Sequence, residues 1–135
     1  MTNGERADRL LSDAQDVVGE VRSALSRQRC NLAARRAQEV IELVIKALLN
    51  EMGVEYARTH DPAPLLASTL RARHLDYDPA FLDRLAALSA ELAEIRSPAF
   101  YQEMAVGETE ARGYAEGAER ALEFGRNRLA RLRDA

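Results

Sequence analysis

The sequence is poor in cysteine, aromatic residues and lysine, and these shortages exclude several kinds of site. A single cysteine, Cys30, excludes an intramolecular disulfide and a zinc site built from several cysteines. Aromatic residues make up 5% of the chain, and tryptophan is absent. The chain has 19 basic side chains, of which only Lys46 is a lysine. No signal-like segment and no run of about 18 apolar residues is present, so we expect a soluble, cytoplasmic protein with no membrane partner.

The charge balance provides no general attraction to nucleic acid. The 22 acidic residues outnumber the 19 basic ones, which gives a formal net charge of -3. Binding to a polyanion would therefore require a local basic patch. The two histidines, His60 and His74, lie far apart in the sequence without the spacing of metal ligands. We expect no metal site and no cofactor.

Helical patterns fill the rest of the sequence. Alanine, leucine, glutamate and arginine are abundant, and apolar residues recur at helical spacing with no convincing strand. A chain of 135 residues fits one domain, here residues 1–135. We predict four long helices, near residues 5–26, 32–52, 79–96 and 113–131, and a short one after residue 62. The predicted fold is all-α, an up-and-down antiparallel four-helix bundle with an additional short helix.

Local signals predict where these helices begin and end. Three polar residues are candidate N-caps: Asn31, Asp61 and Asp78. Gly53 is expected to end the second helix. Pro98 is expected to end the fourth, because the residue before a proline disfavours the α region. In the last helix, Ala118 and Gly125 would allow a neighbouring helix to approach closely.

The second helix has apolar residues on most sides and only a narrow polar strip. This strip contains Arg35, Glu39, Glu42, Lys46 and Asn50. Lys46 follows Glu42 by one turn, the favourable order for an ion pair. Gln38 borders the apolar side and needs a hydrogen-bond partner there. The strip is either the wet side of a core helix or a surface that faces a partner or ligand.

The same helix carries the argument for a dimer. Leu43, Ile45 and Leu49 lie too far round it for one four-helix core to cover all three. An exposed apolar patch of that size usually marks an interface, so we expect a homodimer.

Taken in order, several short motifs resemble those of the HEPN domain family. The second helix has Ala37-Gln38, then Glu42, then Lys46-Ala47-Leu48. Gly53 closes it, and Thr59-His60-Asp61 opens the next helix. The fourth helix ends in "RSPAFY", from Arg96 to Tyr101, and an Ala- and Leu-rich helix follows. This resemblance covers residues 5–133. It implies a helical bundle that usually forms a homodimer and pairs with a small nucleotidyltransferase in toxin–antitoxin-like modules.

Many proteins of that family look like metal-independent RNases that use an Arg, four to six residues, then a His. An arginine can hold the scissile phosphate, and a histidine can move the 2′-hydroxyl proton. No arginine stands at the required distance before His60 or His74, and no histidine follows Arg96 at that distance. Tyr101 takes such a position, but a phenol is a poor base at neutral pH. We therefore expect no catalytic residues and favour a protein that is not an enzyme. We expect His60 to have a structural role at the helix entrance.

The candidate ligand groove combines Arg96 with aromatic and polar residues: Tyr101, Tyr114, Lys46, Glu42 and Gln38. Arginine and aromatic rings together can hold a nucleotide by phosphate contact and base stacking. Gln102 stands where relatives often have glycine, which leaves the shape of this loop open. The favoured function is a homodimeric module that binds a nucleotide, RNA or a nucleotidyltransferase. The alternatives are a divergent RNase toxin using Arg96 and Tyr101, and a structural adaptor without a ligand.

Overall fold

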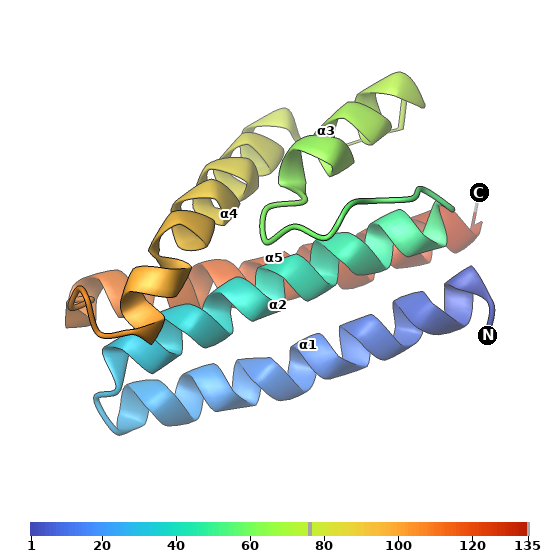
Figure 1. Cartoon of the computed structure of the whole chain (residues 1–135). Coiled ribbons are helices and arrows are strands. Elements are labelled where there is room, and N and C mark those ends of the chain that lie inside the picture. The colour runs from blue at the N-terminus through green and yellow to red at the C-terminus, as the bar shows by residue number, and fades with distance from the viewer. Residues whose placement is uncertain (76, 135) are drawn as a thin grey trace.

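All regular structure in the computed structural model is helical, as predicted. The structure describes residues 1–75 and 77–134, with Phe100 described in its backbone only. Five helices follow one another along the chain (Figure 1): α1 Asn3–Ser26, α2 Cys30–Glu51, α3 Ala63–Ala72, α4 Pro79–Phe100 and α5 Glu108–Asp134.

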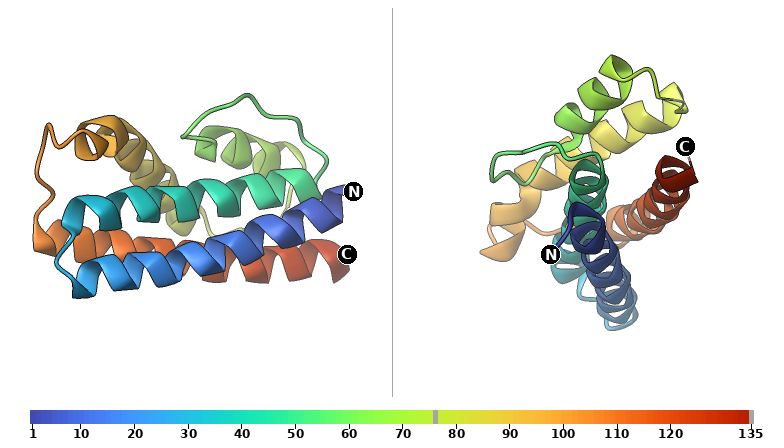
Figure 2. Two further views of the ribbon diagram at one scale, coloured as in Figure 1. Left: turned by 60° about the horizontal axis from the view of Figure 1, so that its bottom comes forward. Right: turned by 90° about the vertical axis from the view of Figure 1, so that its right-hand side faces the viewer.

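Helix α2 is the centre of the molecule and contacts each of the other four helices. Helices α1, α2 and α5 lie side by side, whereas α3 and α4 lie on the opposite side of α2 from α1 (Figures 1 and 2). Helix α4 crosses α2 obliquely, and within the described chain it makes no contact with α1. The regular four-helix bundle that the sequence suggested is therefore not confirmed. The central position of α2 follows from its apolar residues, which point to most sides and must be covered from several directions.

The sequence predicted some helix boundaries and missed others. The Asp78 side chain caps α4, accepting hydrogen bonds from the backbone N–H groups of Ala80 and Phe81. Gly53, with φ +68°, follows the end of α2 as expected. The expectation for Asp61 was wrong: its side chain accepts from Ser89 Oγ at 2.7 Å, and the N-cap residue of α3 is Pro62.

Two helices are longer than predicted because tertiary contacts outweigh local signals. Helix α4 continues through Pro98 to Phe100, since Ala99 is buried in the core and its carbonyl oxygen accepts from Asn31. Helix α5 begins at Glu108 rather than near residue 113, and its additional first turn buries Ala111. Carboxylates in that turn complement the helix dipole.

The expectation that Leu43, Ile45 and Leu49 form an exposed apolar patch for a dimer was wrong. Ile45 and Leu49 are fully buried within the single chain, and Leu43 is half-buried. The connection from α2 to α3 runs back along α2, as Figure 1 shows. Among the described residues, the only large hydrophobic side chains that are exposed are Met1 and Tyr101.

No helix in the described part of the chain is both long and apolar enough to cross a membrane.

Gly125 provides a test of the close packing between α5 and α2. A Cβ atom at Gly125 would lie 2.5 Å from Cγ1 of Val44, a fully buried β-branched residue with little rotamer freedom in a helix. We expect Gly125→Ala to destabilise the protein by about 1–3 kcal/mol. Urea denaturation would measure this as a lower midpoint.

Gly113 on the same helix is the matched control. A Cβ there meets nothing within 4 Å, so Gly113→Ala should stabilise the protein by up to ~1 kcal/mol through helix propensity. Equal effects of the two substitutions would contradict the packing described for Gly125.

Candidate functional site

Gln38 links the middle of α2 to two other segments of the chain. Its side chain is buried, with the residue 2% exposed. Arg96 Nε on α4 donates to Gln38 Oε1 at 2.9 Å. Gln38 Nε2 donates to Glu42 Oε1 at 3.2 Å and to the backbone oxygen of His60 at 3.1 Å. The oxygen and the nitrogen of this amide thus both have hydrogen-bond partners. A buried glutamine needs such partners, as was expected for Gln38 from the sequence.

Glu42 receives contacts from two further side chains. His60 Nδ1 lies 2.6 Å from Glu42 Oε1, and because a carboxylate can only accept, the imidazole donates. Lys46 Nζ lies 3.6 Å from Glu42 Oε2, so the ion pair predicted from their spacing is confirmed. The His60 side chain is 52% exposed, whereas those of Glu42 and Lys46 are 17% exposed. His60 therefore hydrogen-bonds as a structural histidine would, and it also presents part of its ring to solvent.

Lys46 has a second internal contact. Its Nζ lies 5.5 Å from the centroid of the Tyr56 ring, a cation–π distance. Tyr56 is held in turn by Asn50, whose Nδ2 donates to the tyrosine oxygen at 2.7 Å. The single lysine of the chain thus lies under the α2–α3 connection and contacts residues of its own chain.

Three arginines come together near Gln38, and we call Arg35, Arg36 and Arg96 the arginine cluster. Burial lowers the pKa of the Arg35 guanidinium, and the positive charges of Arg36 and Arg96 lower it further, against the opposing charge of Glu39. Glu39 is paired with Arg36, whose Nη1 lies 2.8 Å from Glu39 Oε1. Two segments 60 residues apart therefore concentrate positive charge at one place on a protein of net charge -3.

Asn31 holds the loop that follows Arg96. It was expected to cap α2, but α2 begins at Cys30, and the Asn31 side chain binds the α4–α5 loop instead. Its Nδ2 donates to the backbone oxygens of Ala99 and Met104, and its Oδ1 accepts from the Val106 N–H at 2.8 Å. Together these bonds fix the loop across the beginning of α2.

Gln102 lies in the turn that follows α4. Its φ is +59°, in the left-handed region that glycine enters most easily. The Gln102 side chain contributes to the loop, because Oε1 accepts from Asn31 Nδ2 at 3.1 Å. The loop whose shape the sequence left open thus turns through a left-handed residue at position 102.

A cavity of about 400 Å³ lies between this loop and the beginning of α2. Its lining comprises Gln28, Arg29, Cys30, Asn31, Leu32, Arg35, Gln102, Ala105 and Val106. Arg35 therefore belongs both to the arginine cluster and to the wall of this cavity.

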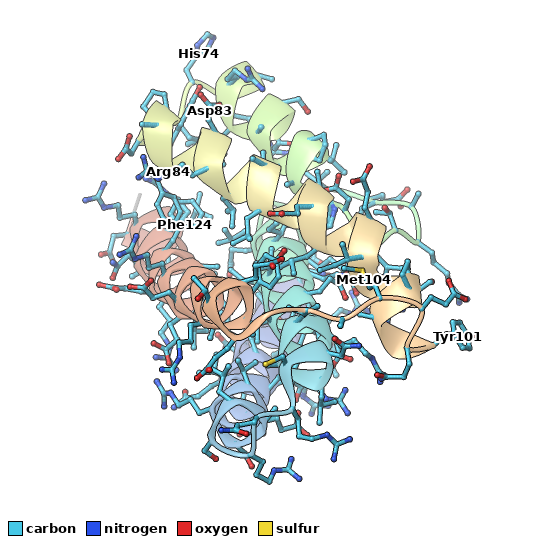
Figure 3. All side chains as sticks on the ribbon, turned by 90° about the vertical axis from the view of Figure 1, so that its left-hand side faces the viewer. His74, Asp83, Arg84, Tyr101, Met104 and Phe124 are labelled. Atoms are coloured by element: carbon cyan, nitrogen blue, oxygen red, sulfur yellow. The ribbon has the colours of Figure 1, made fainter. Side chains whose placement is uncertain are left out.

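The structure links four of the six predicted groove residues: Gln38, Glu42, Lys46 and Arg96. Tyr101 lies at the outer edge of the molecule, 67% exposed, as Figure 3 shows. Tyr114 is buried on α5, and its hydroxyl lies 3.2 Å from Glu91 Oε1 rather than beside Arg96.

Sequence reasoning left three residues out of this site: His60, Arg35 and Arg36. The Thr-His-Asp motif pointed to His60. Its contact with Glu42 could not be predicted, because the two residues are 18 positions apart in the sequence. In the described part of the chain, no three His, Cys, Asp or Glu side chains gather in a way that could hold a metal ion.

Tyr114 should titrate later than an ordinary tyrosine. Burial raises its pKa to about 12, and the neighbouring Glu91 carboxylate acts in the same direction. The neutral phenol is thus favoured in the folded protein, so this contribution to stability is complete below pH 10 and is lost as the pH rises towards 12. Ultraviolet titration of the folded protein should show a late ionisation step that Tyr114→Phe removes. A titration curve that keeps this step in the variant would refute the assignment.

The family comparison agrees with the arrangement of these helices and motifs. No curated protein and no solved structure matches the chain. The HEPN domain model matches residues 7–129, which include the arginine cluster, Gln38, His60 and nearly all of α5. The chain therefore belongs to the HEPN domain family.

Proposed function

We propose that this protein is a binding module for the phosphates of a nucleotide or RNA, and that the arginine cluster makes the contact. The observation that carries the proposal is the placement of Arg96 of α4 on Gln38 of α2, close enough to Arg35 for their charges to interact. Glu39 offsets part of this positive charge through its ion pair with Arg36, and a bound phosphate would offset more of it. The membership in a family associated with nucleotides supports the same ligand.

The geometry of Arg96 suits a phosphate. Its Nε donates to Gln38 Oε1, which orients the guanidinium, and a phosphate would be bound through Nη1 and Nη2. These two groups match the bidentate geometry of a phosphate. Lys46 and Glu42 stabilise the site, because they contact one another and residues of the α2–α3 connection. Tyr101 is exposed beyond Arg96 and is the aromatic residue available to stack with a base.

Binding to a short fluorescent single-stranded RNA tests this proposal. Loss of a charge-assisted hydrogen bond costs about 1.5–3 kcal/mol, so Arg96→Gln should weaken binding about tenfold or more. Each lost phosphate contact should also reduce the slope of log affinity against log salt by about 0.7. Fluorescence anisotropy at several salt concentrations measures both quantities.

Arg84→Gln is the matched control, because Arg84 is an exposed arginine on the same helix near its other end. It should leave both affinity and salt slope unchanged. Equal losses in the two variants would indicate nonspecific attraction and reject the arginine cluster as the site. Absence of binding by the unaltered protein would favour a structural adaptor without a ligand.

A second candidate function, a metal-independent RNase, is favoured by one specific observation. Gln38 and Glu42 form a hydrogen-bonded chain that joins Arg96 to His60. In this alternative His60, rather than Tyr101, is the base. Its Nδ1–H is oriented by Glu42, so the neutral ring carries its lone pair on Nε2.

The reaction would follow the usual chemistry of RNA transesterification. Nε2 of His60 would accept the 2′-hydroxyl proton while the 2′-oxygen attacks phosphorus. A 2′,3′-cyclic phosphate forms as the bond from phosphorus to the 5′-oxygen breaks, and that oxygen takes a proton from water, while His60 later returns its proton to solvent. Arg96 would stabilise the charge on the phosphate.

Incubation of the same RNA with the protein and a chelator separates the two functions. Intact RNA favours the binding module. Cleavage that persists in His74→Ala but is lost in His60→Ala would favour the enzyme, because His74 lies outside the hydrogen-bonded chain. Cleavage that survives both substitutions would exclude His60 as the base.

We also propose a homodimer, a nucleotidyltransferase partner and a role in a toxin–antitoxin-like module. These proposals rest on family membership, since the apolar side of α2 is covered within one chain. Sedimentation equilibrium at micromolar concentration should give the mass of two chains. The mass of a single chain would reject the dimer.

Co-purification with a nucleotidyltransferase encoded beside this protein would test the partner, and its absence from the purified complex would count against the pairing.

A further inference from the structure

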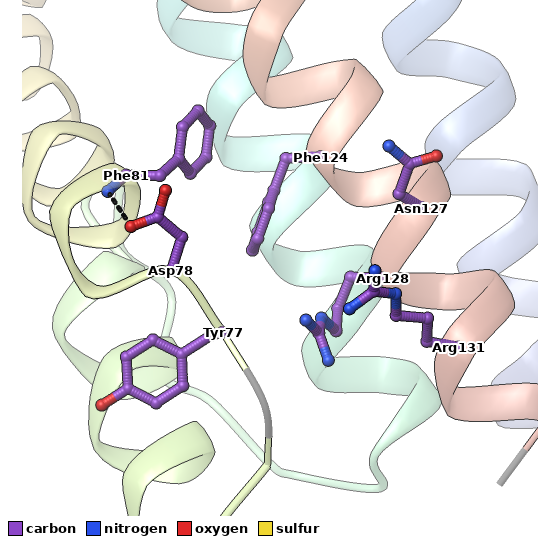
Figure 4. Close-up of a pocket in the computed structure, with 7 residues that line it drawn as sticks. All are labelled: Tyr77, Asp78, Phe81, Phe124, Asn127, Arg128 and Arg131. Carbon is purple, nitrogen blue, oxygen red and sulfur yellow. Dashed lines mark hydrogen bonds between the residues drawn. The ribbon is translucent and has the colours of Figure 1, made fainter.

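A second cavity lies between the beginning of α4 and the C-terminal half of α5 (Figure 4). Its volume is about 400 Å³, within the range of small-molecule sites. Its lining comprises Tyr77, Asp78, Phe81, Phe124, Asn127, Arg128 and Arg131. Phe81 and Arg96 are 15 residues apart on α4, which corresponds to about 22 Å along the helix. The cavity is therefore separate from the arginine cluster.

Aromatic side chains form much of this cavity. The chain has only seven Phe and Tyr residues, three and four respectively, and three of these seven line it. Phe81 and Phe124 form a tilted pair with ring centroids 4.9 Å apart. Tyr77 lies on the segment before α4, and in the view of Figure 4 its ring points away from Phe124 and Arg128. Such a concentration of rings in an aromatic-poor chain provides surfaces on which a planar ring can stack.

Cationic and amide groups from α5 complete the lining. Arg128 is 8% exposed, an unusual burial for a charged side chain, and Arg131 follows it by one turn. A guanidinium has five N–H donors, so both arginines can donate to a ligand in addition to their contacts within the chain. Asn127 adds an amide that can donate and accept.

Asp78 is the acidic residue in this lining, and it has a structural task. Its Oδ1 accepts from the N–H groups of Ala80 at 3.0 Å and Phe81 at 3.3 Å. These bonds hold the carboxylate at the N-terminus of α4. Among the lining residues that the structure describes, the two guanidinium groups of Arg128 and Arg131 outnumber the carboxylate of Asp78.

We propose that this cavity binds a small planar aromatic ligand that carries one anionic group. The ring stacks beside Phe81 and Phe124, and the anion accepts hydrogen bonds from Arg128 and Arg131. The anionic group is a phosphate or a carboxylate, because both can accept two parallel hydrogen bonds from the planar guanidinium of an arginine. This site does not depend on the phosphate-binding function proposed for the arginine cluster.

Amide chemical shifts in NMR titrations with four probes test the proposal. The probes are phenyl phosphate, benzoate, inorganic phosphate and benzyl alcohol. Phenyl phosphate or benzoate should shift the backbone amides of Phe81, Asn127 and Arg131. The concentration needed should be at least tenfold lower than for inorganic phosphate or benzyl alcohol. The tighter of phenyl phosphate and benzoate identifies the anion. Equal weak effects of all four probes would overturn the proposal.

Variants then locate the site. Phe124→Leu removes a stacking surface while keeping an apolar side chain, and Arg131→Gln removes one charge at an exposed position. Each should weaken binding about tenfold, as loss of a charged hydrogen bond or an aromatic contact implies. Arg112→Gln, on the same helix but paired with Glu108, should leave binding unchanged, as should Arg96→Gln. Unaltered binding in both cavity variants, or shifts centred on the arginine cluster, would reject the site.

Discussion

The buried amide of Gln38 is the interaction on which the polar side of this protein depends. A helix as central as α2 can hold a polar side chain in its buried sector only if every hydrogen-bonding group there has a partner. Gln38 meets this condition by accepting from Arg96 and donating to Glu42 and to the backbone of His60. A group left without a partner at such a site costs about 1–3 kcal/mol. The amide therefore fixes the end of α4 and the α2–α3 connection relative to α2, and it orients the side chains of the candidate site.

Asn31 has the same role at the beginning of α2. It binds the loop that joins α4 to α5 and accepts the N–H of Val106. Two amides on one helix, Gln38 and Asn31, thus hold the last turn of α4 from both sides. Arg96 is placed by this arrangement, whereas Tyr101, beyond the end of α4, is left exposed. The site consequently combines a fixed cation with an aromatic ring at the surface.

The sequence was informative where a feature depends on near neighbours along the chain. The cap at Asp78, the turn at Gly53 and the pair of Glu42 with Lys46 all involve partners within a few residues. Asn31 and Asp61 were assigned as caps because their partners, 75 and 28 residues away, leave no local trace.

The same limit explains the mistakes about surfaces. A helical wheel shows that Ile45 and Leu49 are apolar, but not that packing within the single chain buries both of them. The family resemblance brought Gln38, Glu42, Lys46 and Arg96 into one candidate site, and the structure links them. Tyr101 and Tyr114 were added for their chemistry. Their positions depend on the loop after Arg96 and on the rotation of α5, which the sequence pattern does not determine.

The choice of basic residue follows the geometry of each environment. At the arginine cluster, a guanidinium can donate to Gln38 through Nε and still present two further groups in one plane, which a lysine cannot do. Beside Tyr56 and Glu42, the space at position 46 suits a different basic side chain. Lys46 has a compact ammonium on a flexible stem, and it reaches one carboxylate and one ring in a space that leaves 17% of its side chain exposed. Lys46 contacts Oε2 of the largely buried Glu42 carboxylate, and His60 contacts Oε1, so each oxygen of the carboxylate has a partner. Because Glu42 also holds the imidazole of His60, the single lysine is joined through Glu42 to the other residues of the candidate site.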